Sequence, residues 1–134
     1  VNFDEWWENN KEWYLQENIS KEQFKKFSLK NGFNKGDIMV LIGEDAGEIK
    51  IGDVIVFKSK SKDPIIHRVV KKSEDEELFF QTKGDNNKDS ISTGLLDETN
   101  IKEDIIIGKA VVRVPLLGYI KIWFVEILKF IGLA

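Results

Sequence analysis

Residues 65–70 read Ile-Ile-His-Arg-Val-Val and decide the fold class. β-Branched residues dominate this run, and side chains along an extended strand alternate between its two faces. His67 therefore shares one face with Val69, and Arg68 points to the other. A titratable ring on an apolar strand face is either a core histidine with one backbone partner or a functional residue.

Short strands of the same kind lie on both sides of this run. Clusters of Gly, Asp, Asn, Ser and Lys separate them, as is typical of turns. The expected strands are residues 37–42, 53–57, 65–70, 78–82 and 105–114. The segment at residues 84–104 holds few apolar positions and predicts a long surface loop. The pattern thus predicts a mainly β domain with short helices at its N-terminal side.

The N-terminal segment predicts two helices. In residues 1–17 the Trp, Tyr and Phe side chains fall within an arc of about 120° at 100° per residue, which is an amphipathic pattern. This aromatic stripe either packs on the sheet or forms an interfacial belt at the level of lipid headgroups. Ser20 followed by Gln23 has the spacing of a capping box, and the helix that it opens should end near Asn31 and Gly32.

The C-terminal segment is strongly apolar. Of the 19 residues at 116–134, 14 are hydrophobic, and Lys121, Glu126 and Lys129 fall within about 140° of one another on a helical wheel. A membrane-spanning helix needs about 20 residues with few charges. This segment is therefore interpreted either as lying on a surface or as the beginning of a longer apolar segment. Because the chain begins at Val1 without an initiator Met or a signal peptide, we expect a fragment of a longer protein.

Length and composition exclude several classes of protein. A chain of 134 residues corresponds to one domain. Its net charge of −3 and pI near 5.3 provide no basic field for phosphate backbones, so nucleic acid is not an expected partner. The lack of cysteine removes disulfides, thiolate zinc sites and Cys nucleophiles. With a single histidine, a metal could be held only by carboxylates, and no cofactor is expected.

One further run has the composition of a functional turn. Residues 82–87 read Thr-Lys-Gly-Asp-Asn-Asn. A glycine, an acid and two amides at the end of a strand form a tight turn that can aim a carboxylate back over the sheet. The pairs Gly36-Asp37 and Gly52-Asp53 each precede β-branched residues and predict turns that enter strands.

Taken in their order along the chain, the Gly-Asp pairs, the strand at residues 65–70 and the turn at residues 82–87 resemble the type I signal peptidases of the archaeal and endoplasmic-reticulum branch. The matching stretches are residues 36–40, 52–57, 65–70, 82–87 and 108–120. The resemblance implies a single peptidase domain whose core, residues 36–115, is a coiled antiparallel β-sheet or partial barrel. Residues 1–35 are then an aromatic-rich helical insertion, and residues 116–134 form a tail directed at the membrane. No cofactor is implied.

The resemblance also assigns roles to three side chains. In this branch a histidine replaces the bacterial lysine base, and one or two aspartates follow it. His67 then is the general base, Asp85 the first acidic residue and Asp89 the second, at a shorter gap than the family has. A Ser hydroxyl is a weak nucleophile until a base takes its proton, and a carboxylate fixes the tautomer of that base. We therefore expect the side chains of His67 and Asp85 to face each other, directly or through one water.

The family writes its nucleophile as Ser-Met-x-Pro, from which this chain departs. Ser28 lies at a compatible distance before the first Gly-Asp pair, but Leu29 stands for the Met and Asn31 for the Pro. Some archaeal members instead carry an aromatic insertion after the Ser-Met box. If residues 1–35 are such an insertion, the nucleophile precedes Val1, and the sequence favours this interpretation over Ser28.

The resemblance implies a membrane-associated serine endopeptidase that removes signal peptides from secreted preproteins. Its catalytic domain would lie on the extracytoplasmic face of the cell membrane, with membrane lipid as a second partner. Two alternatives are a non-catalytic β scaffold that binds peptides or partner subunits at a membrane, and a self-cleaving repressor-type peptidase of the same fold. The latter group uses lysine as its base and carries a DNA-binding module, so His67 and the acidic charge argue against it.

Overall fold

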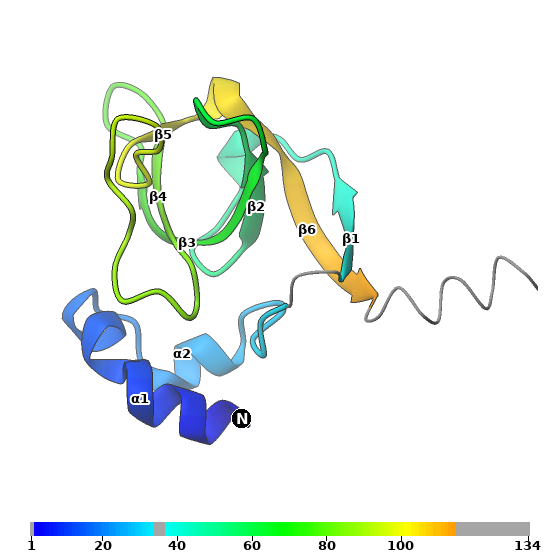
Figure 1. The fold of residues 1–134 in the computed structure, drawn as a ribbon. Helices are drawn as coiled ribbons and strands as arrows, with labels where there is room; N and C mark the ends of the chain where they lie inside the picture. The colour runs from blue at the N-terminus through cyan, green and yellow to red at the C-terminus, as the bar shows by residue number, and fades with distance from the viewer. Residues whose placement is uncertain (1, 34–36, 115–134) are drawn as a thin grey trace, which may run out of the picture.

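A six-stranded antiparallel sheet forms the centre of the molecule (Figure 1). The computed structural model describes residues 2–33 and 37–114 of the chain. The strands are β1 (Ile38–Ile42), β2 (Val54–Phe57), β3 (Ile65–Ser73), β4 (Phe79–Lys83), β5 (Ile101–Lys102) and β6 (Ile106–Val114), with 3-10 turns η1 (Ala46–Glu48) and η2 (Glu103–Ile105). Their order is β1-β6-β2-β3-β4-β5, so β1 and β5 lie at opposite ends and the sheet curls without closing.

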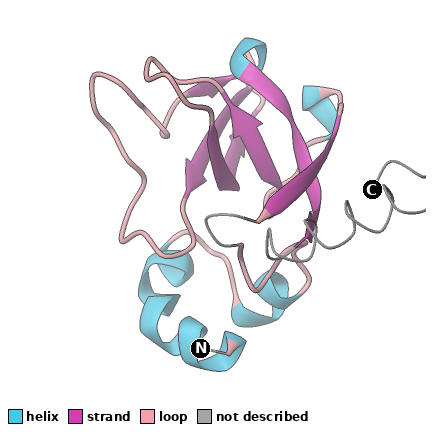
Figure 2. Cartoon of the chain, turned by 45° about the vertical axis from the view of Figure 1, so that its right-hand side comes forward, coloured by secondary structure: helices cyan, strands magenta, loops and turns pink. Residues whose placement is uncertain are grey.

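Two helices lie together on one side of this sheet (Figure 2). α1 (Phe3–Gln16) begins at Asn2, whose side chain accepts a hydrogen bond from a backbone N–H of the first turn. α2 (Lys21–Lys25) begins at Ser20, whose hydroxyl accepts from the Gln23 N–H at 3.1 Å. Both side chains satisfy N–H groups that have no partner inside a helix. The predicted cap at Ser20 is confirmed.

The structure confirms the mainly β architecture and the five expected strands. The surface loop predicted at residues 84–104 is wrong in part. β5 falls inside this segment and pairs with β4, placing Ile101 opposite Phe80 with no exposed surface. Ile101 is buried through this distant pairing, which local periodicity does not reveal, whereas Leu95 of the same segment is 62% exposed.

α2 ends earlier than the sequence predicts. The expected helix reached Gly32, whereas the observed helix ends at Lys25. Leu29 and Gly32 have φ angles of 53° and 75°, a left-handed conformation that a right-handed helix cannot continue. The chain instead turns toward the sheet, where the carbonyl oxygens of Ser28 and Leu29 accept hydrogen bonds from Arg68.

Apolar side chains pack on both faces of the sheet. The sheet core consists of Ile49, Ile55, Phe57, Val69, Phe80 and Ile101. The helix cluster joins α1 and α2 to the sheet and consists of Trp7, Tyr14, Ile19, Phe24 and Val70. Val69 and Val70 are neighbours in β3 yet belong to different clusters, which confirms the alternation predicted along this strand. The aromatic stripe of α1 therefore packs on the sheet, and burying each large side chain stabilises the fold by about 1.5–3 kcal/mol.

The apolar C-terminal segment, with Lys121, Glu126 and Lys129, lies outside the described residues. Its predicted position on a surface or bilayer stays a prediction. Within residues 2–33 and 37–114, no helix combines the length and the apolar character needed to cross a bilayer.

Candidate active site

His67 lies within β3, where it pairs with Ile55 of β2. Its side chain is 20% exposed, and its Nδ1 atom contacts the Oε1 atom of Glu98. The turn after β4 approaches the ring so closely that a Cβ atom at Gly84 would lie 2.9 Å from Nε2. Glycine is the residue that allows this approach. The partner of the ring is thus a carboxylate and not the backbone group expected of a core histidine.

Glu98 is fully buried, and its carboxylate is held by several donors. The Thr82 hydroxyl donates to Oε1 at 2.9 Å, and the Ile91 N–H donates to Oε2 at 2.7 Å. The backbone of Glu98 is fixed at the same time, because its carbonyl accepts from the Thr82 N–H and its N–H donates to the Ile91 carbonyl. A buried carboxylate needs such partners, and several fixed donors hold it in one orientation.

This arrangement defines what the imidazole can do chemically. An ionised carboxylate is only an acceptor, so its contact with Nδ1 requires a proton on Nδ1. The neutral ring then carries its lone pair on Nε2, and within the described part of the chain no hydrogen bond reaches that atom. An Nε2 lone pair beside a close turn, with a carboxylate on the Nδ1 side of the ring, is the geometry of a general base.

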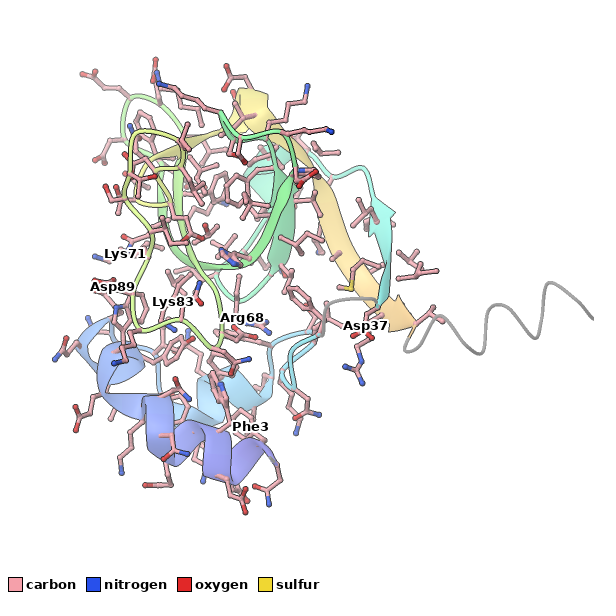
Figure 3. The ribbon with its side chains drawn as sticks, in the orientation of Figure 1. Phe3, Asp37, Arg68, Lys71, Lys83 and Asp89 are labelled. Atoms are coloured by element: carbon pink, nitrogen blue, oxygen red, sulfur yellow. The ribbon has the colours of Figure 1, made fainter. Side chains whose placement is uncertain are left out.

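Arg68 points to the opposite face of β3 and lies between the sheet and the helices (Figure 3). Its Nε and Nη2 atoms donate to the two carboxylate oxygens of Asp85, each at 2.9 Å. The expectation that Asp85 faces His67 is therefore wrong. The planar guanidinium matches both oxygens of a carboxylate, and Arg68 lies on the face opposite His67, as strand alternation predicts.

Comparison with known proteins gives the chain its family. No family model matches it. It is 34% identical over 119 residues to the signal peptidase complex catalytic subunit SEC11 of Clavispora lusitaniae, a match that covers 80% of this chain and 70% of the relative. SEC11 of Lachancea thermotolerans is 37% identical over 106 residues, 74% of this chain and 62% of that one. The chain belongs to the signal peptidase family.

A mammalian relative in this family is the signal peptidase complex catalytic subunit SEC11C of Canis lupus familiaris, which is 32% identical over 108 residues. That match covers 77% of this chain and 56% of the relative. The matches therefore span 56% to 70% of the length of these three relatives.

The second aspartate assigned from the signal peptidase resemblance lies beside α1 (Figure 3). Asp89 is exposed, and its Oδ1 accepts from Trp13 Nε1 at 3.0 Å and from the Ser90 N–H at 2.7 Å. These contacts attach the turn after β4 to the helix. Among the described residues, neither Asp85 nor Asp89 contacts His67. The carboxylate that contacts it is Glu98, which lies in the same segment, residues 84–104.

Ser28 lies on the side of β3 opposite the candidate base His67. It is exposed, just after α2, and its carbonyl oxygen accepts from Arg68 Nη1 at 2.7 Å. Arg68 and His67 point to opposite faces of the strand. The backbone of Ser28 is therefore held on the face of β3 opposite the imidazole.

Lys83 is the other buried ionisable group near the turn after β4, with 1% of its surface exposed. Its Nζ atom donates to the Tyr14 hydroxyl and to the Gly84 carbonyl, each at 3.0 Å, and lies 4.6 Å from the centre of the Tyr14 ring. Burial lowers the pKa of the Lys83 ammonium to about 8, and the charges of Asp85 and Asp89 oppose this shift. Burial also raises the pKa of the Tyr14 hydroxyl above its ordinary value.

Glu98 is the site residue that the sequence interpretation missed. It stands in Leu-Leu-Asp-Glu-Thr-Asn, residues 95–100, inside the segment predicted to be a surface loop. A lone glutamate between polar neighbours is typical of a solvated surface. Its burial depends on pairing with Thr82 and Ile91, and no short motif in the sequence encodes that pairing.

Proposed function

We propose that this chain carries the catalytic base of a membrane-associated serine endopeptidase that removes signal peptides from preproteins. The observation that supports this most strongly is the contact of the only histidine of the chain with a fully buried carboxylate. Membership of the signal peptidase family supports the same reaction, because the relatives are named catalytic subunits of the signal peptidase complex.

In the proposed reaction His67 Nε2 removes the proton from a serine hydroxyl as its oxygen attacks the scissile carbonyl carbon. The resulting imidazolium donates that proton to the leaving amine, and the carbon–nitrogen bond breaks to give an acyl-enzyme. Water then adds with the same proton transfers and releases the signal peptide. The substrate binds extended, through main-chain hydrogen bonds to a strand edge.

The nucleophile of this proposal lies outside residues 1–134. Ser28, the alternative within the chain, is held on the Arg68 face of β3. The helices α1 and α2 pack together on the sheet, and this packing supports the interpretation of residues 1–35 as an insertion between the nucleophile and the core. The core, residues 36–115, then supplies His67, and the tail at residues 116–134 is directed at the lipid.

The proposed location is the extracytoplasmic face of the cell membrane. Preproteins that cross a membrane present their signal peptides there, with the cleavage site next to the apolar part of the peptide. The apolar composition of residues 116–134 supports contact with lipid. The proposal treats preproteins and membrane lipid as the two partners of the chain.

The test is cleavage of a purified preprotein by a chain extended through its own upstream coding sequence and supplied with lipid vesicles. We expect His67→Ala to lower the cleavage rate by about 10²–10⁴-fold, and alanine at the upstream serine to abolish it. Ser28→Ala and the exposed Asp97→Asn are matched controls that should retain full activity. Loss of cleavage in Ser28→Ala alone would overturn the assignment of the nucleophile. Binding of preprotein without cleavage would favour the non-catalytic scaffold.

A further inference from the structure

We infer that Glu98 is the residue that positions His67, the role that the sequence resemblance gives to an aspartate of the turn after β4. The inference rests on the proposed function for its catalytic meaning, but the contact itself stands on geometry. Glu98 Oε1 meets Nδ1 of the ring, and the side chain is fully buried.

Both aspartates of that turn are occupied elsewhere. Asp85 uses its two carboxylate oxygens for Arg68, on the opposite face of β3. Asp89 is exposed and accepts from Trp13 and from the Ser90 backbone. Glu98 is therefore the carboxylate that the described residues place against the ring.

The surroundings of Glu98 are built to aim one oxygen at the ring. The backbone N–H of Ile91 donates a hydrogen bond to Oε2 at 2.7 Å. The Thr82 hydroxyl donates a second hydrogen bond to Oε1 at 2.9 Å. With both flanks fixed, Oε1 keeps the Nδ1–H tautomer and leaves the lone pair on Nε2. A positioning residue of this kind acts through the ring and does not touch the substrate.

The same contacts predict what Glu98→Gln would do. The Ile91 N–H can only donate, so it selects the amide oxygen of the glutamine for the position of Oε2. The amide nitrogen then occupies the position of Oε1, beside His67 Nδ1 and the Thr82 hydroxyl. Because an amide N–H donates, it stabilises the tautomer with its proton on Nε2. In that tautomer the lone pair lies on Nδ1, so Nε2 cannot accept the proton of a nucleophile.

The experiment uses ¹⁵N-histidine labelling of the 134-residue chain, where one histidine gives one pair of ring signals. For the neutral ring we expect the Nδ1–H tautomer in the wild-type chain and the Nε2–H tautomer in Glu98→Gln. Glu98→Asp keeps the charge and should keep the Nδ1–H tautomer. Asp85→Asn and Asp97→Asn are controls that should leave the ring signals unchanged.

A wild-type chain with its proton on Nε2 would overturn the inference, even if Glu98→Gln failed to fold. So would a switch of tautomer in Asp85→Asn. In the extended chain, Glu98→Gln should lower kcat by about 10³–10⁴-fold with little change in KM, and Asp97→Asn should not. If the ring shows the expected tautomers but no preprotein is cleaved, the proposed function fails and the positioning role of Glu98 stands.

Discussion

His67 and Arg68 are adjacent in β3, and each pairs with a carboxylate from a distant part of the chain. The partner of His67 is 31 residues away, and the partner of Arg68 is 17 residues away. The imidazole keeps a partly exposed edge, whereas the guanidinium is 1% exposed under the helices. One strand thus separates a group available for chemistry from a group that holds the structure together.

β4 repeats the same division. Thr82 donates to Glu98 on the face of His67, and Lys83 pairs in register with Arg68 and reaches Tyr14 on the face of the helices. Alternation along two paired strands therefore keeps the two sets of charges apart. Substitutions of the charged groups on the helix face should change stability, and substitutions of His67 and Glu98 on the other face should change catalysis.

The helix face contains the charge whose removal should cost the most stability. Arg68 donates to Asp85 and also to the carbonyl oxygens of Ser28, Gly52 and Leu29, at 2.6 to 2.8 Å. Arg68→Met removes these donors and leaves a carboxylate and three carbonyls without them. We expect the free energy of unfolding to fall by about 3–5 kcal/mol, measured by urea denaturation followed by tryptophan fluorescence.

Lys71→Met is the matched control for that experiment. Lys71 lies in the same strand and pairs with Glu17 at 2.8 Å, but 57% of its side chain is exposed. An exposed ion pair contributes less than about 1 kcal/mol. A similar small loss in Arg68→Met would contradict the structural role assigned to the helix face.

The two faces also show how far the sequence could be used to predict the structure. The alternation of residues 65–70 places His67 and Arg68 on opposite faces, as observed, and the turn at residues 82–87 forms where its glycine and amides predict. The turn was expected to aim the Asp85 carboxylate back over the sheet at His67, and the carboxylate instead binds Arg68. The predicted partner was wrong, because periodicity gives the face of a side chain but not which group reaches it from another segment.

Glu98 illustrates the same limit in a stronger form. Its neighbours in sequence are polar, and it becomes buried only when residues 91–98 fold back along β4. His67 and Glu98 are 31 positions apart in the sequence, and β4, a turn and this folded loop lie between them. Such a contact belongs to the tertiary structure, and no local propensity contains it.

The second prediction tests the buried cation of the helix face through its pH dependence. Burial lowers the pKa of Lys83 from 10.5 to about 8, so between these values the unfolded chain binds a proton that the folded chain does not. Stability therefore rises with pH in this window, by about 1.4 kcal/mol per pH unit. The raised pKa of Tyr14 opposes this rise once unfolded tyrosine ionises above about pH 10.

The measurement is the difference in unfolding free energy between the wild-type chain and Lys83→Met from pH 7 to pH 10. The wild type should gain about 2 kcal/mol relative to the variant between pH 8 and pH 10, and the difference should be flat between pH 7 and pH 7.5. A flat difference across the whole range would mean that the Lys83 ammonium is solvated in the folded chain.

The third prediction concerns Asp89, where the smallest effect is expected. The resemblance makes Asp89 a catalytic acid, whereas the structure makes it an anchor of α1. Asp89 accepts one hydrogen bond from Trp13 and one from its neighbour's backbone, both at an exposed position. Asparagine keeps an oxygen acceptor for both, so Asp89→Asn should cost no more than about 1 kcal/mol of stability.

The same variant separates an anchor of the helices from a catalytic acid. If Asp89 oriented the base, Asp89→Asn would lower cleavage by orders of magnitude, as loss of the acid does in a triad of serine, histidine and aspartate. Because the carboxylate contacts α1 and not His67, we expect the cleavage rate of Asp89→Asn in the extended chain to stay within about 3-fold of wild type, a barrier change of under about 1 kcal/mol. A larger loss of cleavage rate with unchanged stability would show that Asp89 acts in catalysis and not as an anchor of the helices. The division between structural charges on the helix face and catalytic groups on the His67 face would then be wrong.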